Sequence, residues 1–408
     1  MKRRLPVDKC SMTRIYSLLF TFIVLAVISC APPPPPATDK LPAAGLYNNE
    51  EGSPVYSMID NAQRTIDIEI YQMTDPDFVS SIRKAIFRGV KIRVVKEPAP
   101  LGDTCRVFES SSDDSDDCKT QKSLMAEIKN NGGAYIAFNK EELCGAGGTK
   151  CFLHGKMVIA DEKVVMISTG NFNKSNLCNQ KQNPVKCNRD YSVVLRDNDV
   201  SAALEKIFVN DLAAKRYDLA AILDDKVKNK ITVSPLSLEP TLAFIKTAKK
   251  SIKIQNQYLK ETNMNKALTE AAKNGVKVEI MVASLCSFGK PSERDVKNNS
   301  DLFSSFDQAG IQSKMFTVKN MVGGHPGYMH AKTILIDDSY AWVGSVNGSS
   351  TALTMNREFG AFLGDAKSIQ KLQEVTDKDF INPGAETWQD SLVCKNDSAS
   401  DDSGGGDN

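Results

Sequence analysis

The order of apolar and polar positions in the first half of the chain predicts helices that alternate with strands. Apolar residues at helical spacing around Ile59 precede an alternating run over residues 65–71. A second helical pattern passes through Ile82 and is followed by an apolar run over residues 90–95. Because strands that alternate with helices at this spacing usually lie parallel in one sheet, we predict a β-α-β unit.

The second half of the chain repeats this order. Ile245 takes the helical position, residues 251–254 and 276–281 form the two apolar runs, and a helical pattern through Leu268 separates them. An internal repeat of this length indicates a duplicated structural unit. We therefore predict an α/β fold with two similar lobes.

Segments of different composition flank the two predicted lobes. We place the N-terminal lobe at residues 45–222 and the C-terminal lobe at residues 231–394. Residues 30–44 include five consecutive prolines, which favour an extended, stiff linker. Residues 395–408 consist mainly of Asp, Ser and Gly, so we expect a disordered acidic tail.

An apolar segment near the start predicts export. Residues 15–28 form a long uncharged apolar run behind five basic residues, as in a secretory signal peptide spanning residues 1–29. Residues 27–30 (Val-Ile-Ser-Cys) resemble the lipobox of bacterial lipoproteins, in which the cysteine becomes the lipid-bearing N-terminus. With Ala31 next, the resemblance implies a lipoprotein at the outer membrane, on its periplasmic face or on the cell surface. A plain signal peptide with an incidental Cys30 is the alternative.

The composition excludes several classes of protein. The chain is 41% hydrophobic and 25% charged, as in a soluble globular protein, which argues against a disordered chain. Its 51 basic and 50 acidic residues nearly cancel, and removal of residues 1–29 leaves a formal charge of −3. No strong positive field therefore marks a nucleic-acid binder.

The cysteines predict disulfides. Of ten cysteines, Cys10 would be removed with the signal peptide and Cys30 acylated, which leaves an even number in an oxidising compartment. Closing short loops has a low entropic cost, so we predict three pairs between cysteines that are close in sequence: Cys105–Cys118, Cys144–Cys151 and Cys178–Cys187. Cys286 and Cys394 remain and are predicted to pair with each other. The first pair would close an acidic loop at residues 113–117, for which calcium binding is the disfavoured alternative. A zinc site is disfavoured because no Cys-x-x-Cys occurs.

Two of the three histidines stand in matched motifs. Each begins a His-x-Lys sequence that reaches an Asp after seven positions and an Asn after seventeen. The matched residues are His154, Lys156, Asp161 and Asn171 in the first motif and His330, Lys332, Asp337 and Asn347 in the second. Since side chains alternate along a strand, each His and Lys should project to one side about 6.6 Å apart, whereas each Asp should face away at a turn. The returning strand should bring each Asn back towards the histidines.

These side chains suit the cleavage of a phosphodiester. The lysines and asparagines, as phosphate-binding groups, supply positive charge and donors to the non-bridging oxygens. One His can attack phosphorus while the other protonates the leaving oxygen. Asp190 and Glu358, which end matched Asn-Arg-Asp and Asn-Arg-Glu sequences, are predicted to orient the imidazoles. This chemistry predicts no metal and no cofactor.

Both motifs resemble the His-x-Lys-x4-Asp-x6-Gly-Ser-x-Asn pattern of the phospholipase D superfamily. The first copy departs from it, with Ser168-Thr169 in place of Gly-Ser. The resemblance implies two α/β/α sandwich lobes in a pseudo-twofold arrangement, with both motifs in one cleft of a monomer. It implies that all six His, Lys and Asp residues of the motifs are catalytic. It also implies a covalent phosphohistidine on His154, with His330 as acid and base.

The substrate is a separate inference. The superfamily includes phospholipases, phosphatidyltransferases such as cardiolipin synthases, and nucleases. A lipid anchor at Cys30, the slightly negative mature charge and residues 254–259, which resemble an Ile-Glu-Asn-Gln-Phe-Phe strand of phospholipases D, favour phospholipid at a membrane surface. We therefore predict hydrolysis of phospholipid headgroups or their exchange.

Three alternatives stay open. An envelope-anchored, metal-independent endonuclease would have nucleic acid as its substrate and would need a local basic groove. A cardiolipin-synthase-like phosphatidyltransferase is less favoured because such enzymes usually carry membrane helices. A binding protein without activity is disfavoured by the intact motifs. The third histidine, His325, lies in a Gly-rich segment and is predicted to be a loop residue.

Overall fold

The first half of the chain forms a sheet of seven strands in the order β1-β7-β6-β5-β2-β3-β4. In this computed structural model, β2, β3 and β4 are parallel and all other neighbours are antiparallel. The strands are β1 (Gly45–Asn48), β2 (Thr65–Ile70), β3 (Lys91–Lys96), β4 (Ala134–Ala137), β5 (Lys156–Ala160), β6 (Val164–Ser168) and β7 (Tyr191–Leu195). The predicted parallel β-α-β unit is confirmed.

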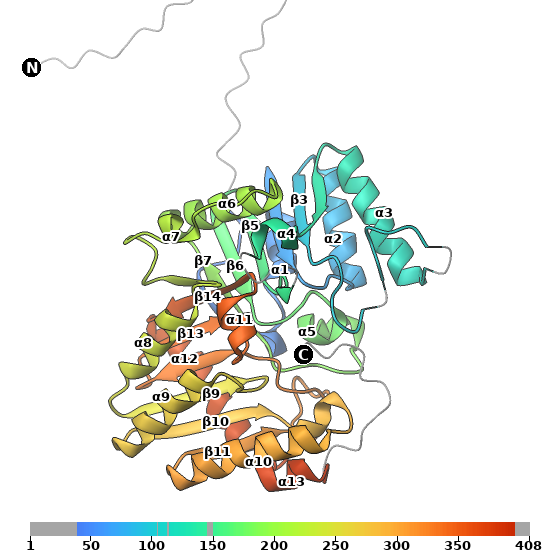
Figure 1. Ribbon diagram of the computed structural model, residues 1–408. Helices are drawn as coiled ribbons and strands as arrows, with labels where there is room; N and C mark the ends of the chain where they lie inside the picture. The colour runs from blue at the N-terminus through green and yellow to red at the C-terminus, as the bar shows by residue number, and fades with distance from the viewer. Residues whose placement is uncertain (1–38, 104, 112–113, 145–149, 396–408) are drawn as a thin grey trace, which may run out of the picture. The chain divides into compact units, whose positions relative to one another are not determined.

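The second half repeats the same sheet. Its order is β11-β10-β9-β12-β13-β14-β8, with β9, β10 and β11 parallel and the remaining neighbours antiparallel. The strands are β8 (Ile231–Ser234), β9 (Ser251–Asn256), β10 (Lys277–Ala283), β11 (Gln312–Phe316), β12 (Thr333–Ile336), β13 (Tyr340–Gly344) and β14 (Glu358–Leu363). Figure 1 shows the first lobe in blue to green and the second in yellow to red. The predicted α/β fold of two similar lobes is confirmed.

The structure describes residues 39–103, 105–111, 114–144 and 150–395. The predicted signal peptide, most of the linker, Cys30 and nearly all of the acidic tail lie outside these residues. From Lys40 onward the described residues belong to one compact unit. No helix in these ranges combines the length and the apolar character that a membrane span needs.

Helices cover both faces of each sheet. Those of the first lobe are α1 (Val55–Asn61), α2 (Pro76–Phe87), α3 (Asp116–Asn130), α4 (Lys140–Leu143), α5 (Lys174–Leu177), α6 (Asn198–Leu212) and α7 (Leu219–Ile222). Those of the second are α8 (Leu238–Lys246), α9 (Thr262–Lys273), α10 (Glu293–Gln308), α11 (Ser350–Thr354), α12 (Ala366–Phe380) and α13 (Trp388–Leu392). Matching carboxylates begin α2 and α9, since Asp75 accepts from the backbone of Phe78 and Glu261 from that of Met264.

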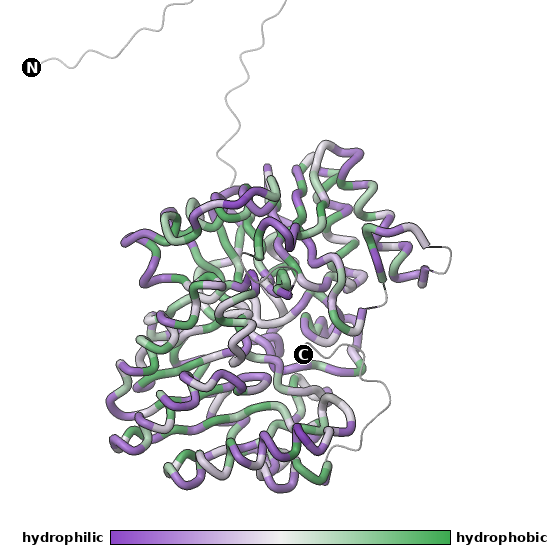
Figure 2. The backbone as a smooth tube through the Cα atoms, in the orientation of Figure 1, coloured by the Kyte–Doolittle hydropathy of each residue, from purple (hydrophilic) through white to green (hydrophobic). Residues whose placement is uncertain are grey.

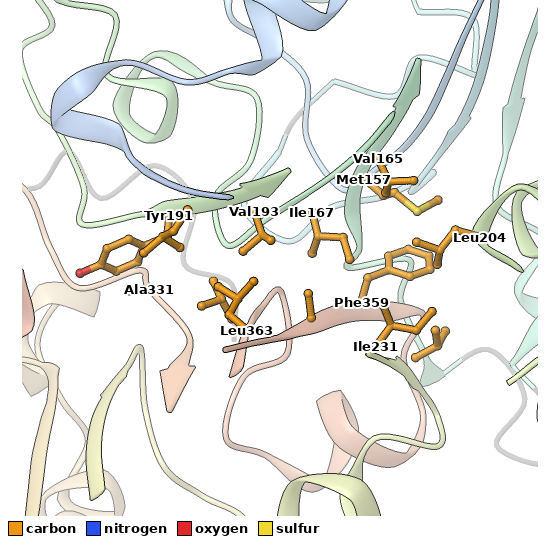
Figure 3. Packing of buried hydrophobic residues seen from close by; sticks show 14 of the residues in the cluster. Met157, Val165, Ile167, Tyr191, Val193, Leu204, Ile231, Ala331, Phe359 and Leu363 are labelled. Carbon is orange, nitrogen blue, oxygen red and sulfur yellow. The ribbon is translucent and has the colours of Figure 1, made fainter. Parts of the chain in front are cut away.

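The shared core lies where the inner faces of the two sheets meet. Val193 and Ile167 of the first sheet belong to one buried cluster with Phe359 and Leu363 of the second, and Leu204 of α6 joins them (Figure 3). Figure 2 shows hydrophobic positions along the strands and hydrophilic ones on the outer helices. Burial of a phenylalanine such as Phe359 contributes about 1.5–3 kcal/mol, so this contact holds the lobes together.

All four predicted disulfides are present. Their Cα–Cα separations are 5.2, 5.6, 5.2 and 5.5 Å, which suits disulfide geometry. The Cys105–Cys118 bond joins the acidic loop to the first turn of α3. Asp116 and Asp117 of that loop lie in the same turn, where carboxylates oppose the positive end of the helix dipole.

The strands of the two motifs begin later than predicted. β5 starts at Lys156 and β12 at Thr333, so both histidines lie in irregular segments before the strands. The two residues of each His-x-Lys sequence therefore do not share one regular strand, as the prediction from side-chain alternation required. The returning strands β6 and β13 are confirmed as antiparallel neighbours of β5 and β12.

Candidate active site

Each motif histidine is held by a carboxylate from the opposite lobe. His154 Nδ1 lies 2.9 Å from Glu358 Oε2, and His330 Nδ1 lies 2.9 Å from Asp190 Oδ1. All four side chains are buried. The predicted contacts of Asp190 and Glu358 with the imidazoles are thus present, and the partners are exchanged between lobes. A carboxylate on Nδ1 keeps that nitrogen protonated and leaves Nε2 as the reactive atom.

Backbone hydrogen bonds reinforce this exchange. The His154 amide donates to the carbonyl of Arg357 at 3.0 Å, and the His330 amide donates to that of Arg189 at 3.2 Å. The amides of the two arginines donate in return, to Phe152 at 2.8 Å and to Tyr328 at 3.0 Å. Each histidine is therefore fixed to the residue just before its own carboxylate partner.

The two arginines also form ion pairs between the lobes. Arg189 binds Asp379 of α12 through two nitrogens at 2.7 and 2.8 Å, and Arg357 binds Asp211 of α6 at 2.8 Å. Burial acts to lower the pKa of both guanidinium groups, but the attraction of these aspartates raises it above its usual value. The sequence showed the matched Asn-Arg pairs but gave no sign of this role, because Asp211 and Asp379 lie in otherwise ordinary amphipathic helices.

Both motif lysines fold back onto their own histidines. Lys156 Nζ donates to the carbonyl of His154 at 2.7 Å, and Lys332 Nζ donates to that of His330 at 2.6 Å and to Thr169 at 3.2 Å. Both ammonium groups are fully buried. The two positive charges therefore stand beside the two imidazoles, where a phosphate between the histidines would be attracted to both.

The motif asparagines are buried with hydrogen-bonding capacity left over. Asn171 donates to Gln72 at 3.4 Å, a long contact. Among the described residues, the Oδ1 atoms of Asn171 and Asn347 have no hydrogen-bond partner. Buried polar atoms in native proteins are nearly always satisfied, so unsatisfied amides in this place indicate groups that meet a ligand.

Asp190 lies in a dense network of donors. It accepts from Thr169 Oγ1 and Asn176 Nδ2, both at 2.6 Å, as well as facing His330. Burial acts to raise the pKa of Asp190, but attraction to His330 and Lys332 brings it below its usual value. Thr169 is one of the two residues that depart from the superfamily pattern, and its hydroxyl donates to this carboxylate.

The motif aspartates bind backbone amides at the far ends of β5 and β12, and their catalytic role, which the resemblance implies, stays a prediction. Asp161 follows the far end of β5 and accepts from the backbone amides of residues 63–65, the closest at 2.7 Å. Asp337 follows β12 and accepts from the amides of residues 249–251, the closest at 2.7 Å. Both adopt positive φ angles in turns. Their contacts fit a structural role at the turn, as strand alternation predicted.

A cavity of about 220 Å³ opens onto the first histidine. Its lining combines His154 and Tyr71 of the first lobe with Asn347, Tyr258 and Lys260 of the second. The Tyr71 ring lies edge-on to the imidazole with the ring centres 4.8 Å apart. The sequence argument did not single out Tyr71, Tyr258 or Lys260. Tyr258 lies within residues 254–259, which resemble a strand of phospholipases D, and Lys260 directly follows them, so this resemblance was the available signal.

The third histidine takes no part in this cluster. His325 Nε2 lies 3.0 Å from Gln180 Oε1, within a loop contact, and is not among the residues that line the cavity. Its predicted position in a loop is confirmed. Among the described residues, no group of three or more His, Cys, Asp and Glu side chains is arranged to hold a metal ion.

The matched motifs, the duplicated sheets and the shared cluster can now be compared with known proteins. A family profile described as "Cardiolipin synthase, PLD-like domain" matches residues 55–212 and 241–380, which is more than half of the chain. The chain belongs to this PLD-like family. The profile spans both His-x-Lys motifs and both carboxylate partners.

Individual relatives of this PLD-like chain match over shorter stretches. A cardiolipin synthase of Staphylococcus aureus is 33% identical over 134 residues, which is 33% of this chain and 25% of that protein. A cardiolipin synthase of Listeria welshimeri is 28% identical over 141 residues, which is 34% of this chain and 27% of that protein. The chain thus spans about a quarter of the curated relatives that it matches.

Two solved structures share the fold of this PLD-like chain. Phosphatidylserine synthase of Haemophilus influenzae has a TM-score of 0.57 at 13% identity and covers 84% of this chain and 87% of its own. Polyphosphate kinase of Porphyromonas gingivalis has a TM-score of 0.54 at 12% identity and covers 83% of this chain and 50% of its own. At these identities the likeness concerns the fold alone.

Proposed function

We propose that this protein transfers phosphatidyl groups from phospholipids to an alcohol, with water as a competing acceptor, through a phosphohistidine intermediate. The observation that carries the proposal is the crossed pairing of His154 with Glu358 and of His330 with Asp190, each at 2.9 Å. With Nδ1 of each imidazole held by a carboxylate, one Nε2 can act as the nucleophile and the other as general acid and base.

In the first step, His154 Nε2 attacks the phosphorus of the donor lipid. A P–N bond forms, the P–O bond to the headgroup alcohol breaks, and the departing oxygen takes a proton from His330 Nε2. The cavity supports this assignment because His154 lines it. Lys156 and Lys332 attract the non-bridging oxygens, on which negative charge concentrates in the transition state.

In the second step, the acceptor oxygen attacks the same phosphorus. The new P–O bond replaces the P–N bond, whose electron pair returns to His154, and the acceptor's proton passes to His330. The cycle ends with both histidines in their starting protonation states. Asn171 and Asn347 have buried amide oxygens without partners among the described residues, and their amides would contact the phosphate or its substituents.

The named relatives support a lipid substrate and favour transfer over hydrolysis. Both curated relatives are cardiolipin synthases, and one structural neighbour is a phosphatidylserine synthase. From the sequence alone, hydrolysis or exchange of phospholipid headgroups is the predicted reaction, and a cardiolipin-synthase-like transfer is a less favoured alternative. The relatives reverse that order, and we keep hydrolysis as the reaction with water.

Location at a membrane is part of the same proposal. A lipid on Cys30 and a proline-rich linker over residues 30–44 would hold the catalytic unit near a bilayer of the bacterial envelope. The effective concentration of phospholipid at the active site would then be high without any membrane-spanning helix.

The test uses mature protein on vesicles that contain phosphatidylglycerol and phosphatidylethanolamine, with a chelator present. We expect released headgroup and newly formed phospholipid, both absent in His154→Ala and His330→Ala. His325→Ala is the matched control, because this histidine contacts Gln180 outside the cluster, and it should retain activity. Parallel samples contain single- and double-stranded DNA.

Each outcome decides a part of the proposal. Cleavage of DNA with intact vesicles would replace the proposal by a nuclease. Headgroup release without any new lipid, even at high alcohol concentration, would reduce it to a hydrolase. Loss of all activity with the chelator would contradict the lysine-based mechanism.

A further inference from the structure

A larger cavity of the second lobe adjoins the catalytic cavity. It measures about 820 Å³ and lies beyond the ends of β9 and β10, beside the first turns of α10. Tyr258 and Lys260 line both cavities, so the two spaces share a wall. The mechanism described above gives the larger space no role.

Positive charge surrounds this larger cavity. Lys260, Lys290 and Arg294 line it, and all three are exposed. Within the described ranges, Lys290 and Arg294 form neither an ion pair nor a hydrogen bond through their side chains. One acidic residue, Asp295, also lines the cavity; its carboxylate bonds Ser292 in the capping box of α10 and is attracted by Lys260 and Arg294, so the three cations outnumber it. The cavity therefore suits a negatively charged ligand.

A buried amide faces the same space. Gln257 is fully buried and lines the cavity, and both its Oε1 and its Nε2 have no hydrogen-bond partner among the described residues. Asn265, which also lines the cavity, has a buried Oδ1 without a partner. A buried amide without partners costs about 1–3 kcal/mol, so its presence indicates a polar ligand that supplies the missing bonds.

The equivalent position of the first lobe carries a different side chain. Tyr71 follows β2 as Gln257 follows β9, and its hydroxyl accepts the Leu101 amide at 2.6 Å. Tyr71 therefore has a protein partner for its polar atom, whereas Gln257 has none among the described residues. Since the lobes otherwise repeat each other strand by strand, this difference marks a specialised role for the second cavity.

The shared wall is firmly attached to the second motif. The amides of Lys260 and Glu261 donate to the carbonyl of Gly348 at 2.5 and 2.9 Å, and the Gly348 amide donates to Asn256 at 3.3 Å. Gly348 directly follows Asn347 of the active site. A group held in the larger cavity is therefore positioned relative to the reacting phosphorus by a backbone connection.

We propose that this cavity is the acceptor subsite and that it binds an alcohol carrying a phosphate group. The inference rests on the proposed function. Lys260, Lys290 and Arg294 neutralise the acceptor's phosphate, and Gln257 bonds its polar atoms. The free hydroxyl then points past Tyr258 to the phosphohistidine. There its oxygen bonds to phosphorus, the P–N bond breaks with its electron pair returning to the imidazole, and the hydroxyl proton passes to His330.

The experiment compares acceptors that differ in charge. Vesicles of a labelled donor phospholipid are supplied with glycerol, with sn-glycerol 3-phosphate, or with phosphatidylglycerol. We expect the double variant Lys290→Glu/Arg294→Glu to raise the KM for both phosphate-bearing acceptors at least about tenfold and to change that for glycerol less than about twofold. The ratio of transfer to hydrolysis falls accordingly, and the two phosphate arms show whether a free or a lipid-borne acceptor is preferred.

A matched control lies on the same helix. Lys297 of α10 is exposed, pairs with Asp301 and does not line the cavity, so Lys297→Glu changes the charge of α10 without touching the subsite. It should leave the KM for every acceptor unchanged. Equal losses in Lys297→Glu and the double variant would show a nonspecific effect of charge at the membrane and would overturn the proposal.

Binding without turnover separates this proposal from the function on which it rests. Titration of His154→Ala protein with sn-glycerol 3-phosphate, followed by NMR, should show saturable binding that Lys290→Glu/Arg294→Glu abolishes and Gln257→Leu weakens. If the wild-type protein turns over no phospholipid, the proposed function fails while this titration still tests the cavity. Absence of binding, or binding that the variants leave unchanged, contradicts the subsite.

Discussion

The buried ion pair between Arg189 of the first lobe and Asp379 of the second should be strongly coupled, so that removal of either partner alone destabilises the protein. Arg189 follows the first lobe's Asn188 and reaches α12 of the second lobe, where two nitrogens bind the carboxylate at 2.7 and 2.8 Å. Neither side chain is more than 3% exposed. We expect Arg189→Met to destabilise the protein because it leaves a buried carboxylate with Gln255 as its remaining side-chain donor.

The magnitude follows from burial. Removal of one partner of a buried ion pair costs about 3–5 kcal/mol, whereas replacement of both by apolar groups is often close to neutral. The double variant Arg189→Met/Asp379→Leu should therefore recover at least about 2 kcal/mol relative to the sum of the single variants. Arg189 also binds Glu50 at 2.7 Å, so Asp379→Leu alone should be the milder single change.

The assay is a double-mutant cycle by urea unfolding. Arg83 and Glu127 form the matched control, since they too make a two-nitrogen pair, at 2.8 and 2.9 Å, but are 41% and 37% exposed. Their coupling energy should stay below about 1 kcal/mol. Equal coupling energies in the buried and the exposed pair would refute the argument that burial between the lobes makes the Arg189–Asp379 coupling strong.

Three further predictions concern single residues. A Cβ on Gly170 would lie 2.7 Å from the Asp190 carboxylate, so Gly170→Ala should displace Asp190 and lower kcat by at least about tenfold, measured on vesicles. Burial and the nearby Asp211 raise the pKa of Glu69 well above 4.5, so Glu69 keeps its proton in the native state at pH values where the unfolded chain has lost it. The free energy of unfolding therefore falls as the pH rises from the unfolded pKa to the native pKa. Between these two pKa values, the stability of Glu69→Gln relative to wild type should rise by about 1.4 kcal/mol per pH unit, measured by urea unfolding at several pH values. Asp337→Asn should lower the unfolding free energy and leave the pH profile of kcat in place, because this carboxylate binds backbone amides of residues 249–251.

Each of these has a contradicting result. A Gly170→Ala enzyme with normal kcat would show that Asp190 tolerates displacement. A stability difference between Glu69→Gln and wild type that is the same at pH 5 and pH 8 would show that Glu69 ionises normally. A shifted pH profile in Asp337→Asn would return this aspartate to the reaction.

The repeated pattern was sufficient to predict the lobes because it depends on local order. Strand alternation over residues 65–71 and its copy at 251–254 predicted two β-α-β units. Short loop length predicted three disulfides, and the fourth followed because two cysteines remained. The start of β5 was missed because the His154 backbone bonds Arg357 of the other lobe instead of the neighbouring strand of its own. A prediction from neighbouring residues cannot identify a hydrogen-bond partner such as Arg357 in the other lobe.

The sequence predicted which histidines and carboxylates form the site, but it did not predict which carboxylate contacts which histidine. Matched spacing pointed to His154 and His330 and to their carboxylates, since the duplication repeats each residue type. Which carboxylate meets which histidine depends on how the lobes face each other, and this arises from packing far along the chain. Gln257 lay in the segment that resembles phospholipases D, but its buried amide without partners among the described residues could not be predicted from the sequence.

The most direct test of the crossed two-histidine mechanism is to trap its intermediate. Protein is mixed with phospholipid labelled at phosphorus, quenched within milliseconds to seconds in alkali, in which phosphohistidine survives, and digested for peptide mapping. The account predicts label on His154, its loss after brief acid treatment, and no label in His154→Ala. Active protein that never carries label on His154 would contradict it, whether the label lies on His330 or on no residue.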